Sequence, residues 1–205
     1  IPNPNAPTGC LLPLDVIKRF LVDAPQRLLV VDEAYIDFGG ESAVGLLAEH
    51  DNLLIVQTLS KSRALAGLRV GLAMGSASLV EALERVKDSF NSYPLDVVAQ
   101  RAATAAFEDA AWFEETCGRV IASRESLRDS LQSLGFEVLP SSANFLLTRH
   151  QRVAGKVLFD ALRERGIIVR RWDKPRIQEY LRISIGTEEQ CQRLVRELEE
   201  ILAQI

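Results

Sequence analysis

The stretch LLIVQTLSKSRALAGLRVGLAMG (53–75) decides the fold. It opens on a continuous apolar run, passes through a polar turn, and returns to an apolar run over 69–74 after a short Gly-containing connection. A similar run over 28–31 lies upstream, inside RLLVVDEAYIDF (27–38). Continuous apolar runs, in contrast to alternating ones, are typical of parallel strands that are buried on both faces. We therefore expect an α/β fold with a mostly parallel sheet and helices around it.

Outside these runs the apolar residues recur mainly at helical spacing. From Ser76 onward the chain is predicted to be helical, with breaks near 91–94 and 108–110, and Gly135 is expected to end a long helix as its C-cap. The segments expected to form helices with clear bounds are 13–24, 41–50, 111–134, 153–165 and 188–203. The short strands expected after the long helix are 136–139, 144–148, 167–170 and 181–185.

This change of pattern near 108–112 predicts two domains. Residues 1–110 are expected to form part of a large domain, and residues 111–205 a smaller α+β domain. With 47% hydrophobic residues among its 205, the chain has enough apolar material to bury one substantial core or two smaller ones.

The charge and the cysteines narrow the possible classes of partner. A net charge of -4 disfavours nucleic-acid and anionic-membrane partners, because both require a basic surface. No apolar run approaches the roughly 20 residues that span a bilayer, and the start has no signal-peptide pattern. The widely spaced Cys10, Cys117 and Cys191 form neither a metal motif nor a disulfide framework, so we expect free thiols in a reducing cytoplasm. His50 and His150 lack a partner motif and are expected to be structural.

Reactive groups cluster where two of the predicted strands end. Asp32 and Tyr35 follow the first run, Ser60 and Lys61 follow the second, and Arg69 opens the third. Ligands of open parallel sheets bind beyond the carboxyl ends of the strands. A lysine amine beside desolvating apolar strands and a second cation is a usable nucleophile. An amine, an acid and an anion-binding Arg/Ser pair together fit a phosphorylated aldehyde cofactor.

The sequence motifs that contain these residues resemble those of the fold-type I aminotransferases, which depend on pyridoxal 5'-phosphate (PLP). Within that group they are most similar to the histidinol-phosphate aminotransferases. The motifs on which the resemblance mainly rests are NPNAPTG (3–9), VVDEAYIDF (30–38) and TLSKSRALAGLRVGLA (58–73). The similarity continues through KDSFNSYPLD (87–96), SSANFLL (141–147), GIIVRRWDKPRI (166–177) and LRISIGTEEQC (181–191). It therefore covers essentially the whole chain.

The resemblance implies a role for each residue at the strand ends. Lys61 would bind PLP covalently and then move the proton between the substrate α-carbon and the cofactor. Asp32 would pair with the pyridine nitrogen and keep it protonated, and Tyr35 would donate a hydrogen bond to the phenolic oxygen. Ser60 and Arg69 would hold the phosphate.

Arginines in the second domain are candidates for substrate binding. Arg170 and Arg182 lie in or near strands that are otherwise apolar, where an arginine loses solvation unless it meets an anion. The resemblance implies that they bind the phosphate of the substrate or the carboxylate of the amino-acid donor. Arg171 is the alternative to Arg170, because neighbours on a strand face opposite sides. Asn144 either lines the pocket or supports a turn.

The chain departs from the family pattern in two ways. Ala6 stands where the family commonly has an Asn that bonds the phenolic oxygen of the cofactor, so either Asn5 substitutes for it or Tyr35 carries that contact alone. Family members also have a long segment of sequence before the NPNAPTG motif. We therefore expect this chain to be the C-terminal portion of such a protein, with sheet edges and apolar faces that are partly uncovered.

The reaction implied is amino transfer between histidinol phosphate and 2-oxoglutarate, giving imidazole acetol phosphate and glutamate, a step of histidine biosynthesis. The resemblance also implies a homodimer. The alternatives within the family are an aromatic aminotransferase and a threonine-phosphate decarboxylase. The alternative from another class is a non-catalytic fragment that serves as an oligomerisation module.

Overall fold

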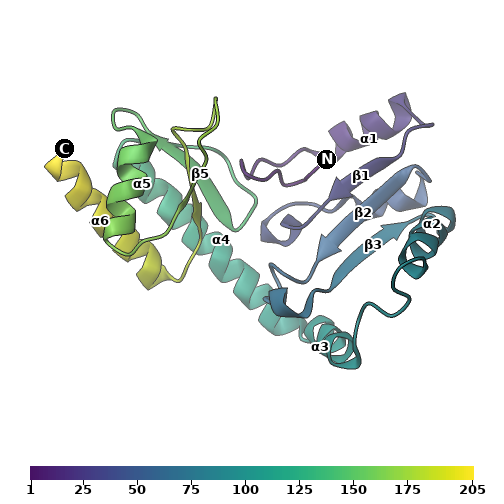
Figure 1. The fold of residues 1–205 in the computed structure, drawn as a ribbon. Helices are drawn as coiled ribbons and strands as arrows, with labels where there is room; N and C mark the ends of the chain where they lie inside the picture. The colour runs from purple at the N-terminus through teal and green to yellow at the C-terminus, as the bar shows by residue number, and fades with distance from the viewer. The chain divides into compact units, whose positions relative to one another are not determined.

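The computed structural model describes residues 1–205, and the chain forms two compact units (Figure 1). The N-terminal unit comprises Ile1–Asn5 and Leu11–Cys117. The C-terminal unit comprises Ala6–Cys10 and Gly118–Ile205. The division therefore falls inside the long helix α4 (Ala110–Ser133).

The N-terminal unit contains a three-stranded sheet of order β1-β2-β3. Its strands are β1 (Leu29–Asp32), β2 (Leu53–Thr58) and β3 (Gly71–Gly75). β1 and β2 are parallel, as expected, but β3 runs antiparallel to β2, so the expected mostly parallel sheet is wrong for this strand. A parallel return needs a crossover, usually a helix, whereas the β2–β3 connection holds only the 3-10 turn η3 (Ala66–Leu68). The mixed α/β class itself is confirmed.

The core of this unit explains why these segments take their structure. Helix α1 (Leu14–Asp23) presents Ile17 and Leu21 on one face, as its helical spacing predicted. Both side chains are buried against Val31 of β1 and Ile55 of β2. Each fully buried aliphatic side chain contributes about 1.5–3 kcal/mol relative to exposure, so this cluster holds α1 on the sheet.

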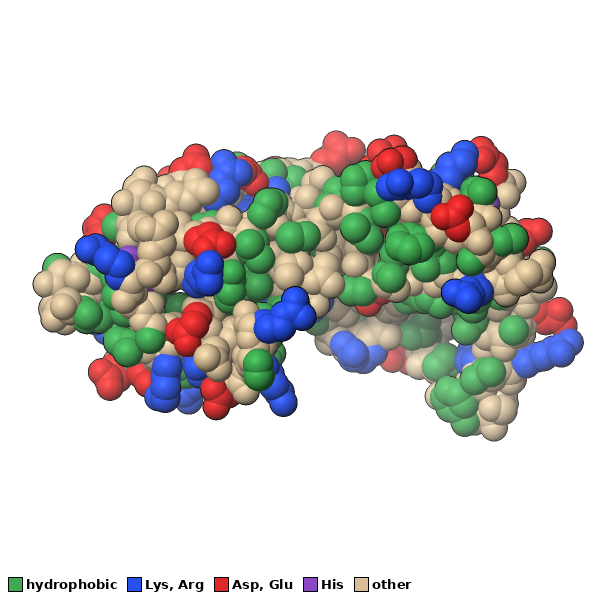
Figure 2. All heavy atoms as spheres, turned by 90° about the horizontal axis from the view of Figure 1, so that it is seen from above, with side chains coloured by type: hydrophobic (Ala, Val, Ile, Leu, Met, Phe, Trp, Pro, Cys, Tyr) green, Lys and Arg blue, Asp and Glu red, His purple; other side chains and the backbone are tan.

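Apolar side chains are also exposed on this unit. In the right half of Figure 2, which views the molecule from above, hydrophobic side chains gather on the side where α1 lies in Figure 1. The exposed large apolar residues of α1, β1 and their flanks are Ile1, Phe20, Val22, Leu28 and Val30. β1 ends the row of named strands, but the N-terminal segment covers part of its edge: the Asp32 N–H donates to the Ile1 carbonyl and the Asn3 N–H donates to the Asp32 carbonyl, each at 2.8 Å. The apolar side chains on this side of the unit nevertheless stay exposed, as expected.

Two of the expected elements differ from those observed. The segment expected to be a helix over 41–50 is the 3-10 helix η2 (Ala43–Ala48), since Gly45 interrupts a run too short to sustain an α-helix. The strand expected over 167–170 is reduced to β6 (Arg170–Arg171). Ile167 instead donates its N–H to the Leu162 carbonyl at the end of the preceding helix, so the chain joins the sheet only later.

The helical middle of the chain follows the predicted breaks. Helices α2 (Ala77–Asp88) and α3 (Val97–Glu108) precede α4. The side chain of Asp96 caps α3 by accepting a hydrogen bond from the Ala99 N–H. Gly135, with a φ of 85°, lies just beyond α4 and allows the chain to turn into the next strand. None of the helices combines the length and the apolar character that crossing a bilayer requires.

The C-terminal unit contains a four-stranded antiparallel sheet of order β4-β5-β7-β6. Besides β6, its strands and helices are β4 (Phe136–Val138), β5 (Phe145–His150), α5 (Gly155–Glu164), β7 (Leu181–Ser184) and α6 (Glu188–Gln204). One face of the sheet packs against α4, α5 and α6 through Leu146, Leu181 and Ile183. Alternate residues on these strands therefore project from the opposite face.

Candidate functional site

The sequence-predicted cofactor residues of the N-terminal unit lie at one edge of its sheet. Asp32 is the last residue of β1, and Lys61 lies in the turn just after β2. Because β1 and β2 are parallel, their carboxyl ends share an edge. Since β2 and β3 are antiparallel, with Thr58 opposite Gly71, Arg69 reaches the same edge just before β3.

The phenol and the amine of this cluster are close. The Lys61 Nζ lies 5.5 Å from the centroid of the Tyr35 ring. The Asp32 Oδ1 accepts a hydrogen bond of 3.0 Å from the Ala34 N–H, which orients the carboxylate. Lys61 is exposed, so the desolvation that we expected for its amine is not supplied by the apolar strands. The polar turn carries the side chain past the end of β2 and away from the core.

The β2–β3 connection is shaped by hydrogen bonds that place Ser60 and Arg69. The Thr58 Oγ1 accepts a 3.1 Å hydrogen bond from the Ser60 N–H and donates a 3.0 Å hydrogen bond to the Ser60 Oγ. Arg69 has a left-handed backbone, with a φ of 57°, and its guanidinium donates to the Ala66 carbonyl at 2.9 Å. A non-glycine residue in this conformation costs about 1–3 kcal/mol and is commonest at functional sites.

The three charged groups of the cluster carry no salt bridge within the chain. Asp32, Lys61 and Arg69 are all exposed, and none of them pairs with another charged residue. An acid, an amine and a guanidinium are therefore available to one ligand. This donor set fits a group that combines an aldehyde, a basic ring nitrogen and a phosphate.

The N-terminal loop is held against β1 by Asn3, which sequence reasoning missed. Its side chain is fully buried and forms two hydrogen bonds with the Leu12 backbone, of 3.2 and 2.7 Å. Its N–H donates to the Asp32 carbonyl at 2.8 Å, so the loop runs beside the cluster. Asn5, the candidate that we expected to replace the family Asn, is half-buried at the end of this loop.

Glu33 was also missed as a structural residue. It is only 2% exposed, and its carboxylate accepts hydrogen bonds from the Ser42 hydroxyl at 2.6 Å, the Ala43 N–H at 2.7 Å and the Gln57 amide at 2.9 Å. The alternation of side chains along a strand was the available signal, because it turns Glu33 inward where Asp32 faces outward. Glu33 thereby fixes the backbone that follows Asp32.

Glu33→Ala is expected to lower the free energy of unfolding of the chain by about 2–4 kcal/mol, because buried donors on η2 and β2 lose their acceptor. Urea unfolding followed by circular dichroism measures the loss. Glu41→Ala is the matched control, since Glu41 is exposed. Equal losses in the two variants would show that the Glu33 network does not stabilise this unit.

A second cluster of contacts lies next to the turn that carries Lys61. The Ser62 hydroxyl donates to the Asp37 carboxylate, and the Arg63 guanidinium carbon lies 4.2 and 4.0 Å from the ring centroids of Phe107 and Phe113. These contacts anchor the two residues that follow Lys61. Nearby, burial raises the pKa of the Cys117 thiol, and the charge of Asp37 adds to that effect. A buried thiol of this kind is chemically inert.

In the C-terminal unit the structure brings the candidate substrate arginines together. Arg170 of β6 is paired directly with Arg182 of β7, so both project from the sheet face opposite the helical core. Arg171, the alternative candidate, donates to the Gln178 carbonyl at 2.7 Å and pairs with Asp173 at 3.5 Å. Arg170 and Arg182 form no such salt bridge, which leaves their charge available to a ligand.

A cavity of about 310 Å³ lies beside the arginine pair. The cavity is lined by Phe159, Arg163, Ile168, Val169, Arg170, Arg171, Arg182 and Ser184. No carboxylate is among these residues, so the lining is strongly cationic and suits an anion. The Nε of Arg182 is buried and has no hydrogen-bond partner in the chain, which leaves a donor unused.

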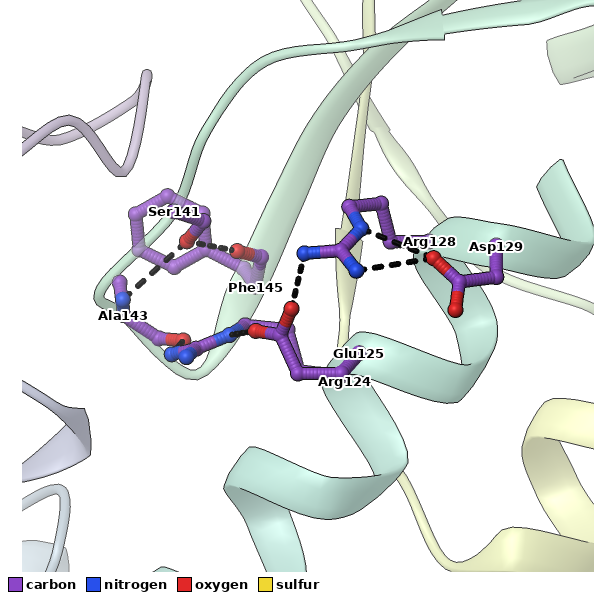
Figure 3. Close-up of polar contacts among 7 residues, drawn as sticks. All are labelled: Arg124, Glu125, Arg128, Asp129, Ser141, Ala143 and Phe145. Atoms are coloured by element: carbon purple, nitrogen blue, oxygen red, sulfur yellow. Dashed lines mark hydrogen bonds and ion pairs between the residues drawn. The ribbon is translucent and has the colours of Figure 1, made fainter. Parts of the chain in front are cut away.

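A buried arginine holds the loop that carries Asn144 (Figure 3). Arg124 of α4 is only 5% exposed and donates to the Ala143 carbonyl at 3.0 Å and to the Glu125 carboxylate at 2.9 Å. The Ser141 hydroxyl, in turn, donates to the Phe145 carbonyl at 2.7 Å. These bonds fix the backbone on both sides of Asn144, whose own carbonyl accepts a hydrogen bond from the Ile185 N–H at 2.9 Å.

The family profile of aminotransferase class I and II matches residues 1–198. The chain belongs to this family. Among its family relatives, histidinol-phosphate aminotransferase 1 of Bradyrhizobium diazoefficiens is 61% identical over 200 residues, which are 98% of this chain and 57% of that protein. Histidinol-phosphate aminotransferase 1 of Pseudomonas aeruginosa is 62% identical over 194 residues, which are 95% of this chain and 55% of that protein. This member of the family thus spans little more than half the length of the curated relatives it matches.

Several solved structures share the fold. Histidinol-phosphate aminotransferase from Clostridium acetobutylicum superposes with a TM-score of 0.92 at 26% identity, over 100% of this chain and 64% of that one. L-threonine-O-3-phosphate decarboxylase from Porphyromonas gingivalis gives a TM-score of 0.80 at 26% identity, over 99% of this chain and 63% of that one. A histidinol-phosphate aminotransferase from Sinorhizobium meliloti, solved in complex with pyridoxal-5'-phosphate, gives 0.88 at 24% identity over 100% of this chain and 56% of that one, which shows the fold alone.

Proposed function

We propose that this chain is part of a PLP-dependent aminotransferase that converts histidinol phosphate and 2-oxoglutarate into imidazole acetol phosphate and glutamate. The observation that carries the proposal is the cluster of an acid, an amine and a guanidinium, all free of salt bridges, at one sheet edge. The relatives at about 60% identity bear the name of this activity, which supports the choice of substrate.

The residues of the cluster suit PLP in their chemistry. Lys61 provides the amine that binds the cofactor covalently and moves a proton at the substrate α-carbon. Asp32 holds a proton at the pyridine nitrogen, and the Tyr35 hydroxyl donates to the phenolic oxygen. Ser60 and Arg69 bind the phosphate, Arg69 through charge-assisted hydrogen bonds. The cofactor, when bound, supplies the electron sink for the electrons that the α-carbon releases.

The arginine pair of the C-terminal unit suits the anionic groups of the substrates. Arg182 is assigned to the substrate phosphate and to the glutamate carboxylate, and Arg170 to the phosphate as a second cation. Asn144 is assigned to the pocket as an amide that the fixed 141–145 loop presents. Asn5 is the remaining candidate contact to the cofactor, at the position next to Ala6.

The proposal extends to the domains, the location and the assembly of the protein. Residues 1–110 form part of the cofactor-binding domain and residues 111–205 the small domain. The protein acts in the cytoplasm as a homodimer. The exposed apolar side chains on α1 and β1 support a further covering partner, since contiguous apolar patches are commonly interfaces.

The alternative function is that of a threonine-phosphate decarboxylase. The observation in its favour is the likeness of the fold to L-threonine-O-3-phosphate decarboxylase, with a TM-score of 0.80. Steady-state assays on a protein of the relatives' full length separate the two. Amino transfer from histidinol phosphate to 2-oxoglutarate supports the aminotransferase. Release of carbon dioxide from threonine phosphate without amino transfer would instead establish the decarboxylase.

In the same assay, Arg182→Ala is expected to weaken apparent affinity for both histidinol phosphate and glutamate by about ten- to a hundredfold, because one charge-assisted contact is lost. Arg170→Ala should affect histidinol phosphate more than glutamate, since a dianion calls for a second cation. Arg196→Ala is the control, because Arg196 is exposed on α6. Unchanged kinetics in Arg182→Ala would place the substrate site elsewhere.

A further inference from the structure

Aromatic rings surround the arginine pair of the C-terminal unit. The Arg182 guanidinium carbon lies 5.0 Å from the Phe145 ring centroid and 5.4 Å from the Trp172 ring centroid. The Arg170 guanidinium carbon lies 5.5 Å from the same Trp172 centroid. One indole ring therefore contacts both cations, at distances where the negative face of a ring attracts positive charge.

This contact opposes a repulsion that the strand pairing creates. Arg170 and Arg182 lie directly opposite each other on β6 and β7, and like charges at such positions destabilise a sheet. No carboxylate of the chain pairs with either of them, whereas the Trp172 ring attracts both. The ring thus lies near both guanidinium groups, and the Nε of Arg182 has no hydrogen-bond partner in the chain.

The backbone around Trp172 keeps the ring on this side of the sheet. Trp172 lies two residues after Arg170, and side chains two apart along an extended chain point to the same face. Between them, Arg171 bonds to the Gln178 carbonyl and to Asp173, which ties down the connection that leaves β6. The indole is half-buried, so part of it is open to a ligand that binds at the arginine pair.

We propose that Trp172 is the positioning residue that makes the arginine pair selective for a phosphate dianion over a carboxylate. The inference deepens the proposed function and rests on it, because it takes Arg170 and Arg182 as the substrate's anion site. A dianion is best bound by two cations held in register, whereas a carboxylate needs one. Loss of the shared ring lets the two side chains move apart, so binding of the dianion weakens more than binding of the carboxylate.

The chain as it stands allows a direct spectroscopic test, because it has only two tryptophans. Trp112→Phe leaves Trp172 as the single indole. Titration of this variant with inorganic phosphate, at ionic strength kept constant with chloride, should change the Trp172 emission in a saturable manner. Acetate under the same conditions should change it less. A flat response to phosphate would overturn the proposal, and no substitution at Trp172 is needed to obtain it.

Calorimetric titration with phosphate then tests the role of the ring face. Trp172→Leu removes the π face and is expected to weaken phosphate binding by about three- to tenfold, while acetate binding changes little. Trp172→Phe keeps a smaller face and should restore much of the affinity. Circular dichroism and thermal unfolding confirm that each variant folds. Equal phosphate affinity in Trp172→Leu and the parent would refute the positioning role.

The variant Arg182→Ala distinguishes a failure of the proposed anion site from a failure of the role proposed for Trp172. If this variant loses phosphate binding but Trp172→Leu retains it, the arginine site stands and only the role of Trp172 fails. If Arg182→Ala binds phosphate as the parent does, the assignment of the anion site in the proposed function fails first, and the inference about Trp172 falls with it.

Discussion

Lys61→Ala is expected to abolish covalent attachment of PLP and to lower amino transfer by at least about 10²- to 10⁴-fold, the range that proton transfer by a positioned side chain contributes. The amine is exposed in the turn after β2, has no salt bridge to break, and lies 5.5 Å from the Tyr35 ring. No carboxylate of the chain pairs with its Nζ. No other lysine follows a strand at this edge of the sheet.

Borohydride reduction of protein incubated with PLP, followed by peptide mass mapping, measures the attachment directly. The pyridoxyl group should be found on Lys61 in the parent and be absent from Lys61→Ala. Lys18→Ala is the control, because Lys18 is an exposed lysine that pairs with Glu49 at 2.9 Å. Stoichiometric labelling of another lysine in the parent protein would overturn the assignment of Lys61.

The parts of the fold that the sequence predicted are those with a local cause. Helix α1, strands β1 and β2, and the end of α4 at Gly135 follow from apolar spacing, continuous runs and a glycine at the helix end. The direction of β3 does not, because it depends on how the chain returns after Lys61 rather than on the apolar run itself. The shortening of β6 likewise depends on a hydrogen bond to the preceding helix.

In the candidate site, too, some residues could be predicted from the sequence and others could not. The sequence places reactive side chains directly after strands, and the parallel pairing of β1 with β2 then brings Asp32 and Lys61 to one edge. Residues that act through strand pairing or another tertiary contact were not predictable. Trp172 gains its role only from the β6–β7 register, and Arg124 from a carbonyl in a loop 19 residues away. Such pairings depend on tertiary packing and leave no periodic signal.

Substitution of Asp32 is expected to have the second large effect on amino transfer, because its carboxylate lies at the end of β1, at the same sheet edge as Lys61. It is exposed at the end of β1, and the hydrogen bond of 3.0 Å from the Ala34 N–H leaves the rest of the carboxylate free. The neighbouring Glu33 fixes the backbone from the buried side. In the role proposed for Asp32, a fixed negative charge at this position would keep a proton on the cofactor's ring nitrogen that an uncharged amide would not hold. Asp32→Asn preserves the shape of the side chain and removes only that charge.

Asp32→Asn in a protein of the relatives' full length is therefore expected to retain PLP and to lose about 10²- to 10³-fold in kcat, as when one preorganised electrostatic partner is removed from a reacting centre. Exchange of the substrate α-proton with deuterium should slow by a similar factor, which locates the loss in proton removal rather than in binding. Cofactor content, measured by absorbance, should stay near that of the parent. Asp51→Asn is the matched control, because Asp51 is exposed and precedes β2 at the opposite end of the strand. Exchange as fast in Asp32→Asn as in Asp51→Asn would mean that the carboxylate does not govern the protonation of the ring, and the role assigned to Asp32 would be wrong.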